Sequence, residues 1–290
     1  MHDHGFSNLA AGEALRGGRR APIIGAMLAN QWQRRIERAE ELAKSRGSAA
    51  EILGFYRAVL VYQLELYREL LGARWAAAAA RNPFAEPLVT ETGRRFGGFL
   101  KMVEESGPAK LAAAAAQVGA SGHDAQGELL GAFWEGKAGV QGTDDFLARA
   151  YLQPLAALLR EKASMRWSGP VPYVCPHCGR KPSGGVLRPL GEGGQRSLIC
   201  SFCLGEWKFR RMVCAACGEE TPDKLAVYTA EELPHVRVEA CESCKSYIKT
   251  VDLTKSGLGE PVVDEIASVA LDLWAQGRGY AKLQVNLMQM

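Results

Sequence analysis

Eight cysteines carry the chemistry that this sequence could perform. Each of them stands in a Cys-x-x-Cys pair, and the first 174 residues contain none. The pairs are Cys175 and Cys178, Cys200 and Cys203, Cys214 and Cys217, and Cys241 and Cys244. A disulfide framework would scatter its cysteines along a secreted chain, whereas paired thiolates are typical of metal ligation in a reducing compartment. The sequence therefore predicts a metal-binding region after residue 174.

The four pairs form an internal repeat. CPHCG at 175–179 matches CAACG at 214–218, and CSFC at 200–203 matches CESC at 241–244. The inserts between the pairs are 21 and 23 residues long, which a small β-ribbon can span. The repeat favours two four-thiolate sites in chain order, the first two pairs forming site one and the last two site two. A cross-brace, in which the first pair joins the third, is the alternative.

Other details of the array follow from the chemistry of such sites. Gly179 and Gly218 follow the first pair of each half, and we predict a positive φ there because glycine adopts it without strain. His177 is predicted to be exposed and not a ligand, since four thiolates already complete a tetrahedral site. The segment WKFRRMV at 207–213 is predicted to be a strand that links the two sites. Spacing does not choose between zinc and iron, nor between a structural and a redox role.

The cysteine-free first part is predicted to be helical. Apolar residues recur at helical spacing from 27 to 46 and again from Ser48, where S-x-x-E forms a capping box. The second helix is predicted to continue through the alanines at 76–80. A further helix is predicted over 144–163, and Pro154 is expected to kink or divide it.

The predicted domain organisation has four parts. SGPVPYV at 168–174 breaks the helical pattern and marks a boundary. We therefore predict an all-α domain followed by two tandem modules and one C-terminal helix, Pro261–Gln276, whose apolar side docks on the core together with the tail. The predicted ranges are 1–168 for the helical domain, 169–210 and 211–257 for the two modules, and 258–290 for the C-terminal helix and tail.

Composition and patterns argue against several function classes. The net charge is +3, and residues 169–257 contain twelve basic and ten acidic side chains. Two divalent ions, each held by four thiolates, would bring that region to about −2, which is unfavourable for binding nucleic acid. The sequence has no apolar run long enough to span a bilayer, and Arg19-Arg20 precede only a short apolar stretch, so we expect a cytoplasmic protein. A catalytic triad, a phosphate-binding loop and a His-x-x-x-His pattern are absent from the sequence, which predicts a protein that is not an enzyme.

The motifs resemble those of the FdhE family of formate dehydrogenase accessory proteins. The resemblance rests on CPHCGRKPSGG, LICSFCLGEWKFRRMVCAACG, EACESCKSYIKTVDL and VVDEIASVALDLWAQGRGYAK, within residues 171–282. It implies an α+β protein in which an all-α domain precedes two rubredoxin-like four-cysteine modules. It also implies two bound metal ions, with iron favoured over zinc, held by all eight cysteines.

The resemblance further implies a function and a partner. The protein would be a cytoplasmic accessory factor, without enzymatic activity, that binds the catalytic subunit of formate dehydrogenase before export. An iron-thiolate redox protein acting in metalloenzyme maturation and a nucleic-acid-binding zinc ribbon are the alternatives, and a homodimer is left open. Five residues beside the ligands are candidates for partner contact or, equally, for the module core or a solvated strand: Trp207, Phe209, Arg210, Arg211 and Tyr247.

Overall fold

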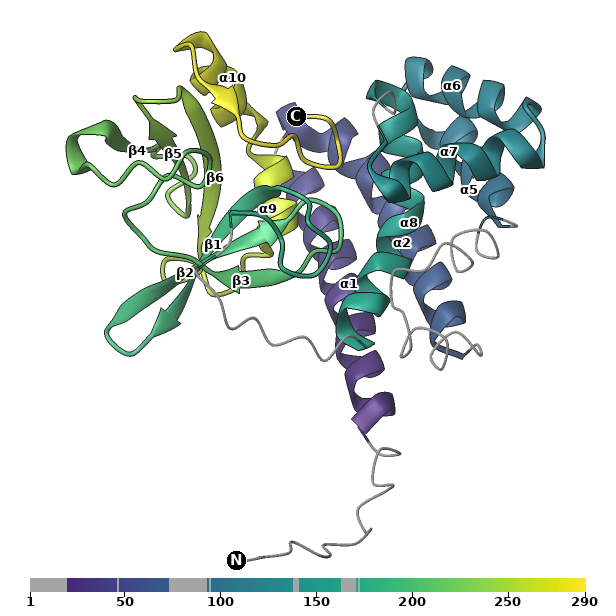
Figure 1. The fold of residues 1–290 in the computed structure, drawn as a ribbon, viewed down its shortest axis with the longest axis horizontal. Coiled ribbons are helices and arrows are strands. Elements are labelled where there is room, and N and C mark those ends of the chain that lie inside the picture. Colours follow the sequence, from purple (N-terminus) through teal and green to yellow (C-terminus); the bar gives the residue numbers. More distant parts are fainter. Residues whose placement is uncertain are drawn as a thin grey trace, which may run out of the picture.

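The computed structural model shows a group of helices beside a twisted sheet (Figure 1). It describes residues 20–45, 47–72, 93, 95–137, 141–162, 171 and 173–290, without the side chains of 20–28, 48 and 72. The predicted helix extension over the alanines at 76–80, the Ser48 side chain of the capping box and most of the boundary segment 168–174 lie outside these residues.

The N-terminal part is helical, as predicted. Its elements are α1 (Arg20–Ser45), η1 (Gly47–Ala49), α2 (Ala50–Gly72), α5 (Phe96–Ser106), α6 (Ala109–Ala120), α7 (His123–Glu135) and α8 (Gly142–Lys162). Helix α8 is buried from Phe146 to Leu159, so it forms the centre of this part. Phe96 and Phe99 of α5 pack on Tyr151 of α8 with ring centroids 4.9 and 5.7 Å apart.

Pro154, which was predicted to kink or divide this helix, lies inside α8, and the helix is not divided there. A proline removes the N–H that would bond the carbonyl four residues earlier, which here is Ala150. The side-chain amide of Gln63 donates a hydrogen bond of 2.6 Å to that carbonyl, and Gln63 is fully buried. The freed carbonyl is thus satisfied from α2, which lets α8 continue past the proline.

The sheet has seven strands within the described residues. They are β1 (Pro182–Leu190), β2 (Gly193–Cys200), β3 (Glu206–Lys208), β4 (Leu225–Thr229), β5 (Val236–Cys241), β6 (Ser246–Asp252) and β7 (Ala281–Lys282). Their order is β3-β2-β1-β6-β5-β4, and β7 pairs with β6. A 3₁₀ turn, η2 (Pro222–Lys224), precedes β4. The repeat seen in the sequence is therefore a repeat of three antiparallel strands, with β1–β3 in the first module and β4–β6 in the second.

The two modules join edge to edge through a parallel pairing of β1 with β6. Gly185 pairs with Thr250, and Val186 pairs with Val251. A Cβ atom on Gly185 would lie 2.4 Å from Oγ1 of Thr250, so this joint requires glycine. The sequence repeat gave no sign of this junction, because parallel pairing between distant strands depends on tertiary contacts.

The predicted linking strand over 207–213 is wrong beyond Lys208. The chain leaves β3 there and turns, while the buried guanidinium of Arg196 donates hydrogen bonds to the carbonyls of Arg210 (2.9 Å) and Val213 (3.5 Å). These bonds take up the backbone carbonyls that a strand would have offered to a neighbouring strand.

The predicted C-terminal helix Pro261–Gln276 is in fact two helices, α9 (Pro261–Ala267) and α10 (Val269–Gly277). The break lies at Ser268, whose ψ of 36° departs from helical geometry. The ammonium of Lys249 accounts for it, since Nζ donates to the carbonyls of Glu265 (2.5 Å) and Ser268 (3.3 Å). The two carbonyls also accept the N–H groups three residues on, those of Ser268 and Leu271, so the buried cation adds to the hydrogen bonds at the break.

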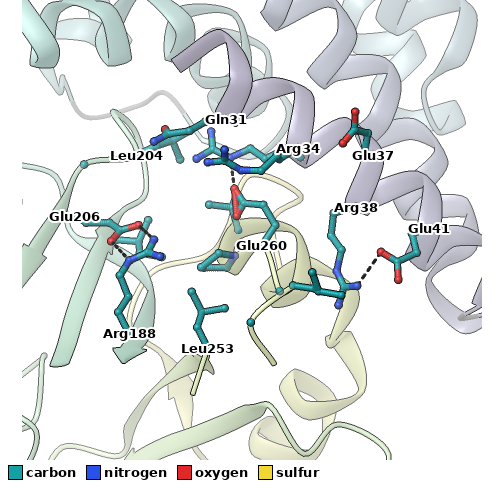
Figure 2. A pocket seen from close by; sticks show the side chains of 18 of the residues that line it. Gln31, Arg34, Glu37, Arg38, Glu41, Arg188, Leu204, Glu206, Leu253 and Glu260 are labelled. Atoms are coloured by element: carbon teal, nitrogen blue, oxygen red, sulfur yellow. Dashed lines mark hydrogen bonds and ion pairs between the residues drawn. The ribbon is translucent and has the colours of Figure 1, made fainter. Parts of the chain in front are cut away.

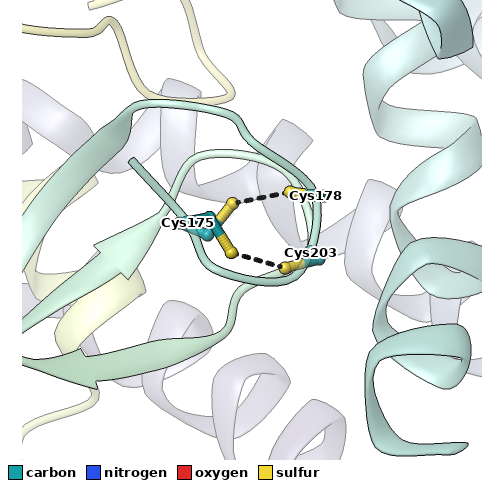
Figure 3. Close-up of side chains that lie close together, drawn as sticks. Cys175, Cys178 and Cys203 are labelled. Carbon is teal, nitrogen blue, oxygen red and sulfur yellow. Dashed lines mark hydrogen bonds between the residues drawn. The ribbon is translucent and has the colours of Figure 1, made fainter. Parts of the chain in front are cut away.

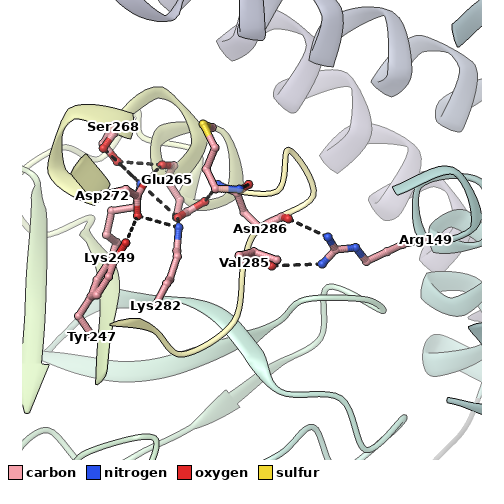
Figure 4. Close-up of polar contacts among 10 residues, drawn as sticks. Arg149, Tyr247, Lys249, Glu265, Ser268, Asp272, Lys282, Val285 and Asn286 are labelled. Carbon is pink, nitrogen blue, oxygen red and sulfur yellow. Dashed lines mark hydrogen bonds and ion pairs between the residues drawn. The ribbon is translucent and has the colours of Figure 1, made fainter. Parts of the chain in front are cut away.

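The chain ends against the helical part. Leu287 is buried in the same hydrophobic core as α2 and α8. The guanidinium of Arg149 on α8 donates to the carbonyls of Val285 (3.1 Å) and Asn286 (2.8 Å) (Figure 4). The architecture is therefore α+β, as predicted: helices, then a sheet with two four-cysteine modules, then C-terminal helices.

Candidate metal centres

The structure gathers the eight cysteines into two clusters in chain order. Cluster one contains the first two pairs, and cluster two contains the last two, with the four sulfurs of each cluster within 4.8 Å of one another. All eight cysteines are free thiols. The arrangement is the sequential one that the repeat favours, and the cross-brace is not formed.

The distances between sulfurs fit a tetrahedral site. In cluster one, Sγ of Cys175 lies 3.5 Å from Sγ of Cys203, and Sγ of Cys178 lies 3.4 Å from that of Cys200 (Figure 3). The corresponding distances in cluster two are 3.7 Å from Cys214 to Cys244 and 3.8 Å from Cys217 to Cys241. Four sulfurs about 2.3 Å from one ion would stand about 3.8 Å apart, whereas a disulfide needs about 2.05 Å. Both clusters fit a zinc or iron ion.

The backbone of each knuckle repeats between the modules. Gly179 and Gly218 have φ of 73° and 80°, as predicted. The second pair of each cluster shows the same geometry without glycine, because Leu204 and Lys245 both have φ of 55°. Leu204 and Lys245 stand at matching places in the repeat, directly after the second pair, and the positive φ lets each loop return its chain to the sheet.

Electrostatics in the clusters favour a cation. Hydrogen bonding with Cys178 and its neighbours holds the pKa of Cys175 far below its ordinary value, while hydrogen bonding with Cys175 raises the pKa of Cys203. In cluster two, burial opposes ionisation of Cys244, but hydrogen bonds with Ser246, Cys217 and Cys241 together outweigh it and lower the pKa to about 7. Four neighbouring thiols cannot all ionise alone, because each thiolate disfavours the next. A divalent ion removes this conflict.

Helices cover cluster one. The ring of Phe202, an intervening residue of the second knuckle, makes edge contacts with Phe133 (5.2 Å between centroids) and Trp134 (5.6 Å) of α7. Nη1 of Arg160 on α8 donates a hydrogen bond of 3.1 Å to the carbonyl of Cys203. Three of the four cysteines belong to the main hydrophobic core: Cys175, Cys200 and Cys203. Cluster one is therefore part of the junction between the helices and the sheet.

Cluster two lies outside both hydrophobic cores of the described residues. Cys217 is exposed and Cys244 is half-buried. The repeat places Ser243 where cluster one has Phe202, and the Ser243 hydroxyl donates to Oε2 of Glu219 at 2.5 Å. The two clusters thus share their donors but not their surroundings.

The two histidines near the ligands have different surroundings. His177 is half-buried rather than exposed, so that part of its prediction is wrong; among the described residues its Nδ1 has no hydrogen-bond partner. It lies outside the cysteine cluster and lines a cleft instead. Nε2 of His235, in the turn before β5, lies 2.8 Å from Oδ1 of Asp264 and so joins this turn to α9.

Of the five residues predicted either to contact a partner or to belong to the module core or a solvated strand, some are buried and others exposed. Trp207, Phe209 and Tyr247 are buried and belong to the module core. Arg210 and Arg211 are exposed, and Arg210 forms an ion pair with Glu220.

A cleft of about 740 Å³ lies where α1, the first module and the start of α9 meet (Figure 2). Ion pairs brace its walls: Arg35 Nε lies 2.6 Å from Glu260, and Arg188 Nη2 lies 2.6 Å from Glu206. Arg34 lines the same cleft and forms no ion pair with any described residue. Leu258, 88% exposed, lies in the same lining. The sequence gave no sign of this cleft, because its lining comes from four distant segments.

A buried ionic cluster braces the second module (Figure 4). Nζ of Lys249 lies 2.6 Å from Asp272 and 3.2 Å from Glu265, and Nζ of Lys282 lies 2.9 and 2.5 Å from the same carboxylates. The Tyr247 hydroxyl donates to Asp272 at 2.8 Å. Two cations and two anions balance, which makes their complete burial tolerable. The sequence contained one signal for this buried cluster. Residues 247–253 alternate along a strand, and the alternation places Lys249 on the same face as the apolar residues Tyr247 and Val251.

Comparison with known proteins identifies this architecture. The fold and sites define a helical protein with two tandem four-cysteine modules. Residues 174–211 match the central domain of FdhE, and residues 212–289 match its C-terminal domain. Residues 174–289 are thus similar to the two cysteine-containing domains of the FdhE family, the family that the motifs resemble.

Individual relatives agree with this assignment. An FdhE homolog of Aquifex aeolicus is 38% identical over 144 residues, covering 49% of this chain and 51% of that protein. An FdhE homolog of Cronobacter sakazakii is 28% identical over 284 residues, covering 91% and 90%. This chain therefore spans only about half, or less, of the length of several relatives that it matches. The share is 51% for the Aquifex aeolicus homolog and 37% for a Haemophilus influenzae homolog.

A solved structure shares the fold. The crystal structure of the FdhE protein from Pseudomonas aeruginosa matches 90% of this chain and 96% of that chain, with a TM-score of 0.66 and 24% sequence identity. Among the residues that the structure of our chain describes, no helix is long and apolar enough to cross a membrane.

Proposed function

We propose that this protein is a cytoplasmic accessory factor for formate dehydrogenase assembly that binds the immature catalytic subunit before export. The observation that carries the proposal is the match of both four-cysteine modules to the two FdhE domains. The protein would act by binding rather than by catalysis, with two metal ions held by Cys175, Cys178, Cys200, Cys203, Cys214, Cys217, Cys241 and Cys244. Iron is the metal we favour, and zinc fits the same donors.

The cleft is the place where we expect the partner to dock. It borders the helical part, the first module and α9, so one bound segment would contact all three. Arg34 offers a guanidinium without an ion-pair partner among the described residues, and Leu258 offers an exposed apolar side chain. A segment with an acidic side chain near an apolar one would match both.

Co-purification tests the proposal. The tagged chain would be produced together with the cofactor-free catalytic subunit of formate dehydrogenase, and the captured subunit measured. We expect capture by the wild type, about tenfold weaker capture by Arg34→Glu, and unchanged capture by the control Arg68→Glu, an exposed arginine of α2 outside the cleft. Absence of capture by the wild type would refute the proposed function. If Arg34→Glu captures as much subunit as the wild type, only the proposal that the partner docks in the cleft would be refuted.

A further inference from the structure

We propose that the two metal centres differ in accessibility, so that the second exchanges its ion with soft ligands from solution while the first stays closed. Both centres offer four thiolates at similar distances. What differs is the protein around them. The inference concerns the loaded ions alone and holds whether or not formate dehydrogenase is the partner.

The first centre is closed by packing. Three of its cysteines lie in the main hydrophobic core, and only Cys178 is half-buried. Phe202, 3% exposed, sits between the knuckle and α7. The guanidinium of Arg180 stacks over the ring of Phe133 at 4.6 Å and donates a hydrogen bond to the Phe133 carbonyl. An incoming ligand would have to displace this aromatic layer before reaching the ion.

The second centre is open on one side. Cys217 is exposed, and Gly218 and Glu219 after it are only half-buried. Ser243, which takes the place of Phe202, is exposed and presents a hydroxyl where the first centre has a ring. Tyr280, in the turn after α10, touches the second knuckle through a hydrogen bond to Glu242 and a ring contact with Lys245, whereas the Ser243 position itself carries no ring. The sulfur of Cys217 is therefore the ligand that solvent and solutes reach first.

This geometry permits ligand exchange without redox change. With an ion bound, Cys217 and Cys244 would be the ligands that a thiolate or nitrogen chelator could replace, because neither side chain is buried. Each departing sulfur would keep its electron pair and take a proton from solvent, and the ion would keep its charge.

Competition with a chromophoric chelator tests this inference. The full-length chain, loaded with zinc to about two ions, is mixed with excess 4-(2-pyridylazo)resorcinol, and the zinc complex is followed by absorbance. We expect two phases of equal amplitude whose rates differ about tenfold or more. N-ethylmaleimide added after the fast phase should label Cys214, Cys217, Cys241 and Cys244, located by peptide mass spectrometry. A single phase, or earlier labelling of the first four cysteines, would overturn the inference.

Two matched pairs of variants assign the phases. Cys217→Ser should abolish the fast phase and keep the slow one, and Cys178→Ser at the matching position of the repeat should do the reverse. Phe202→Ser should speed the slow phase toward the fast one, while Ser243→Phe should leave the slow phase unchanged. If Phe202→Ser does not fold, the order in which N-ethylmaleimide labels the cysteines of the wild type still shows which centre loses its ion first. A chain that loads no zinc at all would overturn metal binding itself, whereas failure to capture formate dehydrogenase would leave this inference standing.

Discussion

The two four-cysteine modules share one repeat in the sequence, yet they pack differently in the fold. The first lies between the sheet and helices α7 and α8, and three of its four cysteines belong to the main core. The second is braced from behind by α9, α10 and the buried lysines, while its cluster exposes Cys217 and leaves Cys244 half-buried. The same set of four cysteines thus lies at the junction of helices and sheet in one module and beside solvent in the other. Ligand identity alone does not decide the role of a site, because the surrounding packing sets its access.

The largest expected effect is the loss of stability when one cysteine is removed from the first centre, compared with the loss at the second. Cys178→Ala should lower the melting temperature by about 10 °C or more, because losing a structural metal site costs about 4 kcal/mol or more and disturbs the packing of α7. Cys217→Ala, at the matching position, should cost clearly less and leave the helical part intact. Thermal unfolding followed by far-UV circular dichroism measures both. An equal drop in melting temperature for the two variants would contradict the claim that the first centre is packed more tightly into the fold than the second.

The next effect tests the brace behind the second module. Lys249→Met leaves two buried carboxylates facing one ammonium, and breaking such a buried group costs about 3–5 kcal/mol. Lys245→Met, which removes an exposed lysine paired with Glu242, is the control and should cost less than about 1 kcal/mol. Urea unfolding gives both free energies. A Lys249→Met protein as stable as the control would show that the ionic cluster does not brace the module.

A smaller effect tests the joint between the modules. Gly185→Ala would place a Cβ atom 2.4 Å from Oγ1 of Thr250 and should cost about 1–3 kcal/mol through strain. Gly184→Ala is the matched control, because its Cβ would meet Glu265 and Lys249 at an ordinary 3.6 Å. Unfolding free energies in urea compare the two variants. If both behave alike, the close contact between β1 and β6 is not a constraint on the fold.

The sequence predicted what depends on local pattern. It located the helical part, the eight cysteines, their grouping in chain order and the positive φ of Gly179 and Gly218. Each of these follows from spacing along the chain or from the conformational freedom of glycine. The positive φ of Leu204 and Lys245 was missed, because neither residue type prefers that conformation and the fold imposes it.

Features that depend on distant contacts could not be predicted in this way. The break between α9 and α10 follows from Lys249, a strand residue that bonds carbonyls of the helix. The continuity of α8 past Pro154 follows from Gln63 on another helix. The different surroundings of the two clusters follow in part from α7, which packs on Phe202 of the first. In each case a contact from elsewhere in the chain decides the local outcome.

Metal content tests the central claim most directly. The wild type, Cys178→Ala, Cys217→Ala and the double variant would be purified without air and analysed by mass spectrometry of the metal. Two four-thiolate centres in chain order predict about two ions in the wild type, about one in each single variant and none in the double variant. One ion remaining in the double variant would indicate that Cys178 and Cys217 share a site, and a wild type without metal would contradict the account altogether.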